Sequence, residues 1–164
     1  MPRRKGEAGG KKPKDGTSSL AYEIDMTEAA EEVYKKLARL SKTAEAAGDY
    51  VNAHCTTFHM VRDAITRIIP NEPHSKNHAL RGDLANIFRL RKGRMRICWI
   101  ASSRMRRVCI LFISESLRKE GDTNDPYEIF KSLLDSGIFD GVIRKYGVRI
   151  PTKTPQRLSL PSVN

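Results

Sequence analysis

Hydrophobic residues in the first half of the chain recur at the spacing of amphipathic helices. Thr27 can cap a helix, and apolar residues then return every three or four positions until Gly48 interrupts the pattern. A second stripe of the same kind follows Asp49, which can cap a helix, and ends at Pro70. The pattern predicts two consecutive helices that each bury one side in a common core.

Short runs with the alternation of β-strands lie on both sides of this helical pair. The segment SLAYEIDM, before Thr27, alternates apolar and polar residues and predicts a first strand. After the polar loop NEPHSKNHALRGD, three more strands are predicted at about 86–91, 94–101 and 106–114. A third helix is predicted from DPYE to Gly137, because Asp125 can cap it and Pro126 suits its first position.

Both ends of the chain have compositions typical of flexible segments. Residues 1–18 are rich in Gly, Lys and Arg, and apart from Met1 they contain no large apolar residue that could offset the entropy of ordering. The last residues contain three prolines among Ser and Thr. We therefore expect a flexible basic arm at 1–18, one folded domain at 19–148 and a flexible tail at 149–164.

The 164-residue chain carries a formal net charge of +11, which favours a polyanionic partner such as nucleic acid or an anionic membrane surface. Its longest apolar run, Val108–Ile113, is far too short to cross a bilayer, and the N-terminus lacks the apolar core of a signal peptide. The three cysteines form no CxxC pair, as is typical of reduced thiols in the cytoplasm. The four histidines do not combine with them at zinc spacing, so we expect a cytoplasmic protein without metal or cofactor.

The stretch FRLRKGRMRICWI brings five basic residues together without an acid. A two-residue turn at Lys92-Gly93 would pair two sets of arginines across a hairpin: Arg91 with Arg94, and Arg89 with Arg96. All four would share one face of the sheet, because side chains alternate between faces. Like charges that face each other cost up to about 1 kcal/mol per pair, and a phosphate-rich partner would relieve this repulsion. The alternative is a solvated surface, which would hold if the register slipped by one residue and divided the arginines between faces.

A second polar cluster, SESLRKEGDTNDPY, follows the last predicted strand. If that strand lies beside the second hairpin strand, Arg118 can reach the face that carries Arg96. Cleavage of RNA without a metal requires activation of the ribose 2′-hydroxyl, charge stabilisation at phosphorus and a proton for the leaving 5′-oxygen. Arginine suits the second task, and Lys119 or Tyr127 could transfer the protons. The alternative is that Arg118–Asp122 form only a salt-bridged loop.

Three segments resemble the RelE/ParE superfamily of toxins from bacterial type II toxin–antitoxin modules, and most closely its RelE and YhaV messenger-RNA interferases. The segments are YEIDMTEAAEEVYKKL, LRGDLANIFRLRKGRMRI and LFISESLRKEGDTNDPYEIF. The resemblance implies an α+β fold: a small antiparallel-rich sheet of about four strands, with two N-terminal helices packed on one face and a C-terminal helix. It also implies metal-independent cleavage of messenger RNA, typically on the ribosome, and inhibition of translation.

The resemblance, together with the hairpin pattern, assigns site residues and partners. The residues expected to be catalytic are Arg96, Arg118, Lys119 and Tyr127. The residues expected to bind RNA are Arg89, Arg91, Lys92, Arg94, Arg106 and Arg107. The expected partners are a cognate antitoxin, messenger RNA and the ribosome, with no membrane. A homodimer and a toxin–antitoxin hetero-oligomer are both open.

Two other functions are compatible with the sequence. The first is a ParE-like inhibitor of DNA gyrase, which would share the fold without chemistry of its own; the dense basic hairpin speaks against it. The second is a non-catalytic RNA-binding module, which would use the same arginines without turnover.

Overall fold

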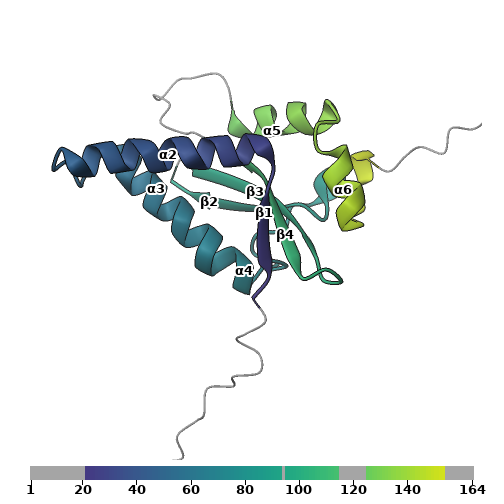
Figure 1. Ribbon diagram of the computed structural model, residues 1–164. Coiled ribbons are helices and arrows are strands. Elements are labelled where there is room, and N and C mark those ends of the chain that lie inside the picture. The colour runs from purple at the N-terminus through teal and green to yellow at the C-terminus, as the bar shows by residue number, and fades with distance from the viewer. Residues whose placement is uncertain (1–20, 94, 115–124, 154–164) are drawn as a thin grey trace, which may run out of the picture.

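A four-stranded mixed sheet lies at the centre of the protein (Figure 1). The computed structural model describes residues 21–93, 95–114 and 125–153. The strands are β1 (Glu23–Met26), β2 (Phe88–Lys92), β3 (Met95–Ser102) and β4 (Arg107–Ile113), and their order in the sheet is β1-β4-β3-β2. Only β1 and β4 are parallel, so the predicted antiparallel-rich sheet of four strands is confirmed.

Two antiparallel helical segments cover one face of the sheet (Figure 1). They are α2 (Glu28–Ala46) and the run formed by α3 (Ala53–Asp63), a π-helical turn (Ala64–Ile68) and α4 (Ile69–Asn71). The hydroxyl of Thr27 accepts a hydrogen bond from the Ala30 amide at 3.2 Å and donates one to the Leu111 carbonyl at 2.8 Å. One threonine therefore caps α2, as predicted, and also fastens it to the sheet.

The start of the second helical segment differs from the prediction. Asn52 caps α3 by accepting a hydrogen bond from the His54 amide at 2.8 Å, whereas Asp49 was the predicted cap. Asp49 instead accepts a hydrogen bond from the Asn52 side chain at 3.1 Å. Asp and Asn are both favourable N-cap residues. Because the turn between α2 and α3 extends to Asn52, Asn52 caps the helix and Asp49 does not.

Two further helices cover the opposite face: α5 (Pro126–Asp135) and α6 (Asp140–Tyr146). Asp125 caps α5 by accepting a hydrogen bond from the Tyr127 amide at 2.9 Å, as predicted. The prediction of a single C-terminal helix was incomplete, because α6 follows after a short turn at Gly137. Its seven residues are too few for a helical stripe to stand out in the sequence.

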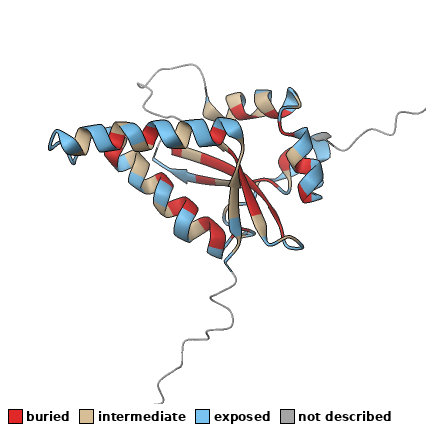
Figure 2. Ribbon diagram, viewed as in Figure 1, coloured by how far each residue is buried: buried red, intermediate tan, exposed pale blue. Residues whose placement is uncertain are grey.

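The sheet separates two apolar cores, and buried residues concentrate on β3 and β4 (Figure 2). Trp99 and Ile97 pack toward α2 and α3, whereas Ile100 and Leu111 pack toward α5 and α6. Arg91, Lys92 and Gly93, at the end of β2 and the start of the turn, are exposed. Two short 3₁₀ turns, Gly82–Leu84 and Pro151–Lys153, complete the described structure. Within it, no helix combines the length and the apolar character that a membrane span needs.

Candidate functional site

The register of the β2–β3 hairpin differs from the predicted one by two residues. Arg91 pairs with Arg96, Arg89 pairs with Cys98, and Lys92 pairs with Met95. The predicted turn at Lys92-Gly93 is therefore wrong, and the turn begins at Gly93, whose φ is 55°. Tight hairpin turns need a positive φ at their first central residue, which glycine adopts more easily than lysine.

The predicted sharing of one face survives this correction, because a shift of two residues leaves every side chain on its original side. Arg89, Arg91 and Arg96 lie on the side of the sheet that carries α5, and we call these three residues the arginine face. One opposed arginine pair remains where two were predicted. Arg94, the fourth predicted member, lies outside the described residues.

Arg96 is fixed by the turn itself. Its guanidinium donates hydrogen bonds to the carbonyl oxygens of Gly93, at 2.7 Å, and Met95, at 2.9 Å. These bonds use only one of the guanidinium nitrogens, Nη1, so donors remain for a ligand. Arg96 is half-buried, whereas Arg91 and Lys92 are exposed.

The arginine face is an electropositive site. Partial burial lowers the pKa of Arg96, and the neighbouring charges of Arg91 and Arg89 lower it further. The carboxylate of Asp125 acts in the opposite direction but does not cancel the shift. Among the described residues, no acid forms an ion pair with any of the three arginines. An anion bound here would relieve their mutual repulsion.

Helix α5 brings Tyr127 to the arginine face. The Arg89 guanidinium lies 5.7 Å from the centre of the Tyr127 ring, and the Lys131 ammonium lies 6.0 Å from it. The structure thus joins Arg89, Arg91, Arg96 and Tyr127, which were predicted together. Lys131 was missed, although its position one helical turn after Tyr127 could have revealed it.

The segment that carries Arg118 and Lys119 lies outside the described residues, but both of its flanks lie near Arg96. The Ser114 amide donates a hydrogen bond to the Arg96 carbonyl at 2.8 Å. The carboxylate of Asp125, at the other flank, interacts electrostatically with the Arg96 guanidinium. Ser114 and Asp125, the described residues on either side of this segment, therefore both lie near Arg96.

Cys98 pairs with Arg89 and lies close to the charges of the arginine face, but its thiol is not suited to act as a nucleophile. Complete burial raises its pKa to about 12, although Arg89 and Arg96 act to lower it. At neutral pH the group is a buried neutral thiol. Among the described residues, no cluster of three or more His, Cys, Asp or Glu side chains could hold a metal ion.

Arg106 and Arg107 do not join the arginine face. Arg107 pairs with Ser102, at the end of β3 opposite to Arg96. It forms hydrogen bonds with the Asp25 carboxylate at 3.0 and 3.2 Å, which raise its pKa, and an ion pair with Glu23 at 2.7 Å. The Arg106 guanidinium lies 5.1 Å from the centre of the Tyr22 ring. The structure places both arginines at the far end of the sheet.

Residues 21–145 of the chain match the model of the Toxin_YhaV family. Its members are described as toxins with endonuclease activity that belong to toxin–antitoxin systems. The chain belongs to this family. The resemblance to RelE- and YhaV-type toxins is therefore confirmed, and the protein is an endonuclease toxin with an antitoxin partner. This membership favours a nuclease over the gyrase inhibitor and the non-catalytic module.

Two solved structures are similar to the toxin. One is the RelBE2 toxin–antitoxin complex of Mycobacterium tuberculosis, with 21% identity, a TM-score of 0.41, and coverage of 57% of this chain and 90% of that chain. The other is the isolated RelE toxin of E. coli, with 14% identity, a TM-score of 0.44, and coverage of 71% of this chain and 98% of that chain. No curated protein matches the sequence.

Proposed function

We propose that the toxin cleaves messenger RNA without a metal ion and that the arginine face binds the phosphate at the cut. The observation that carries this proposal is the opposed pair of Arg91 and Arg96 beside Arg89, without an acid paired to them among the described residues. Such a pair costs stability in the free protein. The negative charge of a sugar–phosphate backbone bound across Arg91 and Arg96 would offset their repulsion, and this gain would add to the binding affinity.

Arginine is suited to the charge that develops during the reaction. Its planar fork donates two parallel hydrogen bonds to phosphate oxygens, and its charge persists at every ordinary pH. Arg96 has donors left over from its bonds to the turn, so it can meet the phosphorane while the turn holds it in place. Loss of one such prearranged donor lowers turnover by roughly 10² to 10³-fold in other enzymes.

The reaction needs no water and no metal. The ribose 2′-oxygen loses its proton and attacks the adjacent phosphorus, and the bond between phosphorus and the 5′-oxygen breaks. The products are a 2′,3′-cyclic phosphate and a 5′-hydroxyl. Tyr127 donates the proton to the leaving 5′-oxygen, and the cations of Arg89 and Lys131 stabilise the phenolate that remains. We assign to neutral Lys119 the acceptance of the 2′-proton and to Arg118 a further phosphate contact. The described residues on either side of their segment, Ser114 and Asp125, lie near Arg96.

The partners and the setting follow from this chemistry. The antitoxin neutralises the toxin by placing acidic side chains on the arginine face, where they replace the phosphates of RNA. The ribosome presents the messenger RNA as an unpaired strand, so cleavage takes place in the cytoplasm during translation. Arg94 and Lys92, at the tip of the hairpin, contact the backbone of the strand on either side of the cut.

The test is cleavage of a messenger RNA by the purified toxin in EDTA, with and without ribosomes, followed by analysis of the 3′ ends. We expect 2′,3′-cyclic phosphates in EDTA, and more product when ribosomes are present. Intact RNA together with inhibition of gyrase supercoiling would instead identify a gyrase inhibitor. Tight binding of RNA that stays intact under all conditions would identify a binding module.

A further inference from the structure

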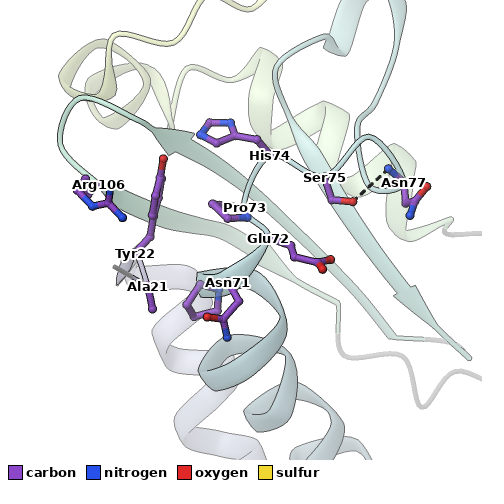
Figure 3. Close-up of a pocket in the computed structure, with 10 residues that line it drawn as sticks. Ala21, Tyr22, Asn71, Glu72, Pro73, His74, Ser75, Asn77 and Arg106 are labelled. Atoms are coloured by element: carbon purple, nitrogen blue, oxygen red, sulfur yellow. Dashed lines mark hydrogen bonds between the residues drawn. The ribbon is translucent and has the colours of Figure 1, made fainter. Parts of the chain in front are cut away.

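A pocket lies at the far end of the sheet from the arginine face, between the residues just before β1, the end of α4, the loop that follows α4 and the β3–β4 turn (Figure 3). Its volume of about 670 Å³ is within the usual range for small-molecule sites. Along β3, Arg96 and Ser102 are roughly 20 Å apart, at about 3.3 Å per residue of strand. The two sites are therefore separate.

Hydrogen bonds hold the walls of this pocket in place. The Tyr22 amide donates to the Pro70 carbonyl at 3.0 Å, which joins β1 to the end of α4. The buried indole of Trp99 donates to the Pro73 carbonyl at 3.0 Å, which fastens the loop after α4 to the sheet. The pocket is thus formed before any ligand arrives, and binding would not have to order it.

Two rings and a guanidinium meet inside the pocket (Figure 3). His74 lies edge-on to the Tyr22 ring, with 5.8 Å between the ring centres, and its Nε2 lies 3.1 Å from the Ser103 hydroxyl. The Arg106 guanidinium lies 5.1 Å from the centre of the Tyr22 ring. Aromatic rings beside a cation are the usual means of binding an unpaired nucleotide, because the rings stack on the base while the cation attracts the phosphate.

The backbone of Arg106 supports a role beyond the turn. Its φ is 51°, in the left-handed region that glycine occupies freely and that arginine occupies at a cost in free energy. Its carbonyl accepts a hydrogen bond from the Glu23 amide at 3.0 Å, so β1 maintains this conformation. A position whose backbone favours glycine but carries arginine is a candidate for selection by a ligand.

We propose that this pocket, the Tyr22 pocket, binds one nucleotide of single-stranded RNA outside the cleavage site, with its base against Tyr22 and His74 and its phosphate on Arg106. The inference rests on the proposed function in taking RNA as the ligand. A strand held at both ends of the sheet would gain affinity from the two sites together. The pocket would then recognise a nucleotide at a fixed distance from the cut.

Glu72 gives the bound nucleotide a direction. It lines the same pocket, and its carboxylate repels phosphate, so the phosphate lies toward Arg106 and the base edge toward Glu72. A carboxylate accepts hydrogen bonds from the amino group of cytosine, which uracil lacks. The Tyr22 pocket should therefore prefer cytidine to uridine.

The test is an NMR titration of the full chain with CMP, UMP and a 2′-O-methyl CCC trinucleotide that cannot be cleaved, followed at the ring resonances of Tyr22 and His74. We expect both rings to shift with CMP, a preference for CMP over UMP of at least threefold that Glu72→Gln removes, and at least tenfold tighter binding of the trinucleotide. Arg106→Ala should weaken binding at least fivefold. The matched control Arg104→Ala, which removes the same charge from the same turn, should change it less than twofold.

The variant Arg106→Gly distinguishes the contribution of the Arg106 side chain to ligand binding from its effect on stability. Glycine relieves the left-handed backbone, so this variant should melt at a higher temperature than the wild type and still lose at least fivefold in CMP binding. Unchanged ring resonances, equal effects of the Arg104 and Arg106 variants, or no gain from CMP to the trinucleotide would each overturn the proposal; the last would indicate a site for free nucleotides. Arg96→Ala should abolish cleavage while the ring shifts persist, so failure of this inference differs from failure of the proposed cleavage.

Discussion

Arg91 and Arg96 face each other across the hairpin, and a fold selected for stability alone would not place them there. The repulsion of an opposed pair of like charges amounts to a few tenths of a kcal/mol up to about 1 kcal/mol, and salt screens the exposed part of it. Arg89 adds to it from the neighbouring position on β2. At the scale of single residues, the arginine face therefore lowers the stability of the free protein and raises its affinity for phosphate. Substitution of one of these arginines should change the two quantities in opposite directions.

Replacing Arg91 should stabilise the protein while it weakens RNA binding. In Arg91→Ala the repulsion on Arg96 falls, so we expect the free energy of unfolding at low salt to rise by a few tenths of a kcal/mol up to about 1 kcal/mol. Urea denaturation measures this change, and RNA affinity measured on the same samples should fall. The matched control is Arg39→Ala, because Arg39 is an exposed arginine on α2 that lies away from the arginine face. It should leave stability unchanged and lower RNA affinity less than Arg91→Ala does. If Arg91→Ala were less stable than the wild type, the pair of Arg91 and Arg96 would not be repulsive in the free protein.

Tyr127 should act on turnover and not on binding. Tyr127→Phe keeps the ring that Arg89 and Lys131 contact but removes the proton, so we expect kcat to fall roughly 10² to 10⁴-fold while KM changes less than twofold. Steady-state cleavage kinetics provide both numbers. Tyr50→Phe, at a tyrosine that is 72% exposed, is the control. Equal activity of the two variants would remove Tyr127 from the reaction.

At the scale of elements, a three-residue link joins α6 to the sheet. The Tyr146 hydroxyl on α6 donates a hydrogen bond to the Asp25 carboxylate on β1, at 2.5 Å, and Arg107 on β4 binds the same carboxylate. Burial acts to raise the pKa of Asp25, but the hydrogen bonds from Tyr146 and Arg107 outweigh it, and the pKa is lowered. Burial and the bond to Asp25 raise the pKa of Tyr146, so its hydroxyl keeps its proton at neutral pH.

The link should make stability depend on pH in the acid range. Because the pKa of Asp25 is lower in the folded than in the unfolded state, its contribution is complete above the unfolded value near 4 and disappears as the pH falls through the folded value. Tyr146→Phe should cost about 1 to 2 kcal/mol at pH 7, toward the lower end because Asp25 is partly exposed. Unfolding experiments at pH 7 and pH 2.5 should show the gap between wild type and variant closing in acid. A gap that stays constant would contradict the assigned bond.

The sequence was most informative where a local period decides the structure. Alternation assigned Arg89, Arg91 and Arg96 to one face although the turn was misplaced, because a shift of two residues preserves faces. Arg106 and Arg107 are neighbours with the same expected function, yet Arg107 binds Asp25, 82 positions away, and Arg106 lies over Tyr22. The contacts of both arginines depend on the parallel pairing of β1 with β4. A local sequence pattern cannot predict a contact between segments so far apart in the chain.

At the scale of the whole molecule, helices cover both faces of the sheet, and the tip of the hairpin remains exposed (Figure 2). The net charge of +11 attracts RNA from all directions, but the two-sided cover leaves the arginine face as the place where β2 and β3 can touch a phosphate backbone. General attraction and local contact should therefore differ in their response to salt.

Salt titration of RNA binding distinguishes these two contributions. Each phosphate contact on single-stranded nucleic acid adds about −0.7 to the slope of log affinity against log salt concentration. We expect Arg91→Ala to reduce the steepness of that slope by about 0.7, because it loses one contact. Arg39→Ala has the same net charge as Arg91→Ala but loses no phosphate contact, so its slope should equal that of the wild type. Identical slopes for both variants would mean that charge alone, and not the arginine face, holds the RNA.

The assignment of the arginine face as the active site is tested by the single-turnover rate of messenger-RNA cleavage in EDTA, measured for the wild type, Arg96→Ala and Arg39→Ala at equal fractions of bound RNA. If the arginine face stabilises the phosphorane, Arg96→Ala should cleave at least about 100-fold more slowly than the wild type, and Arg39→Ala should cleave within twofold of it. Equal rates for all three proteins would contradict the assignment of the arginine face as the active site.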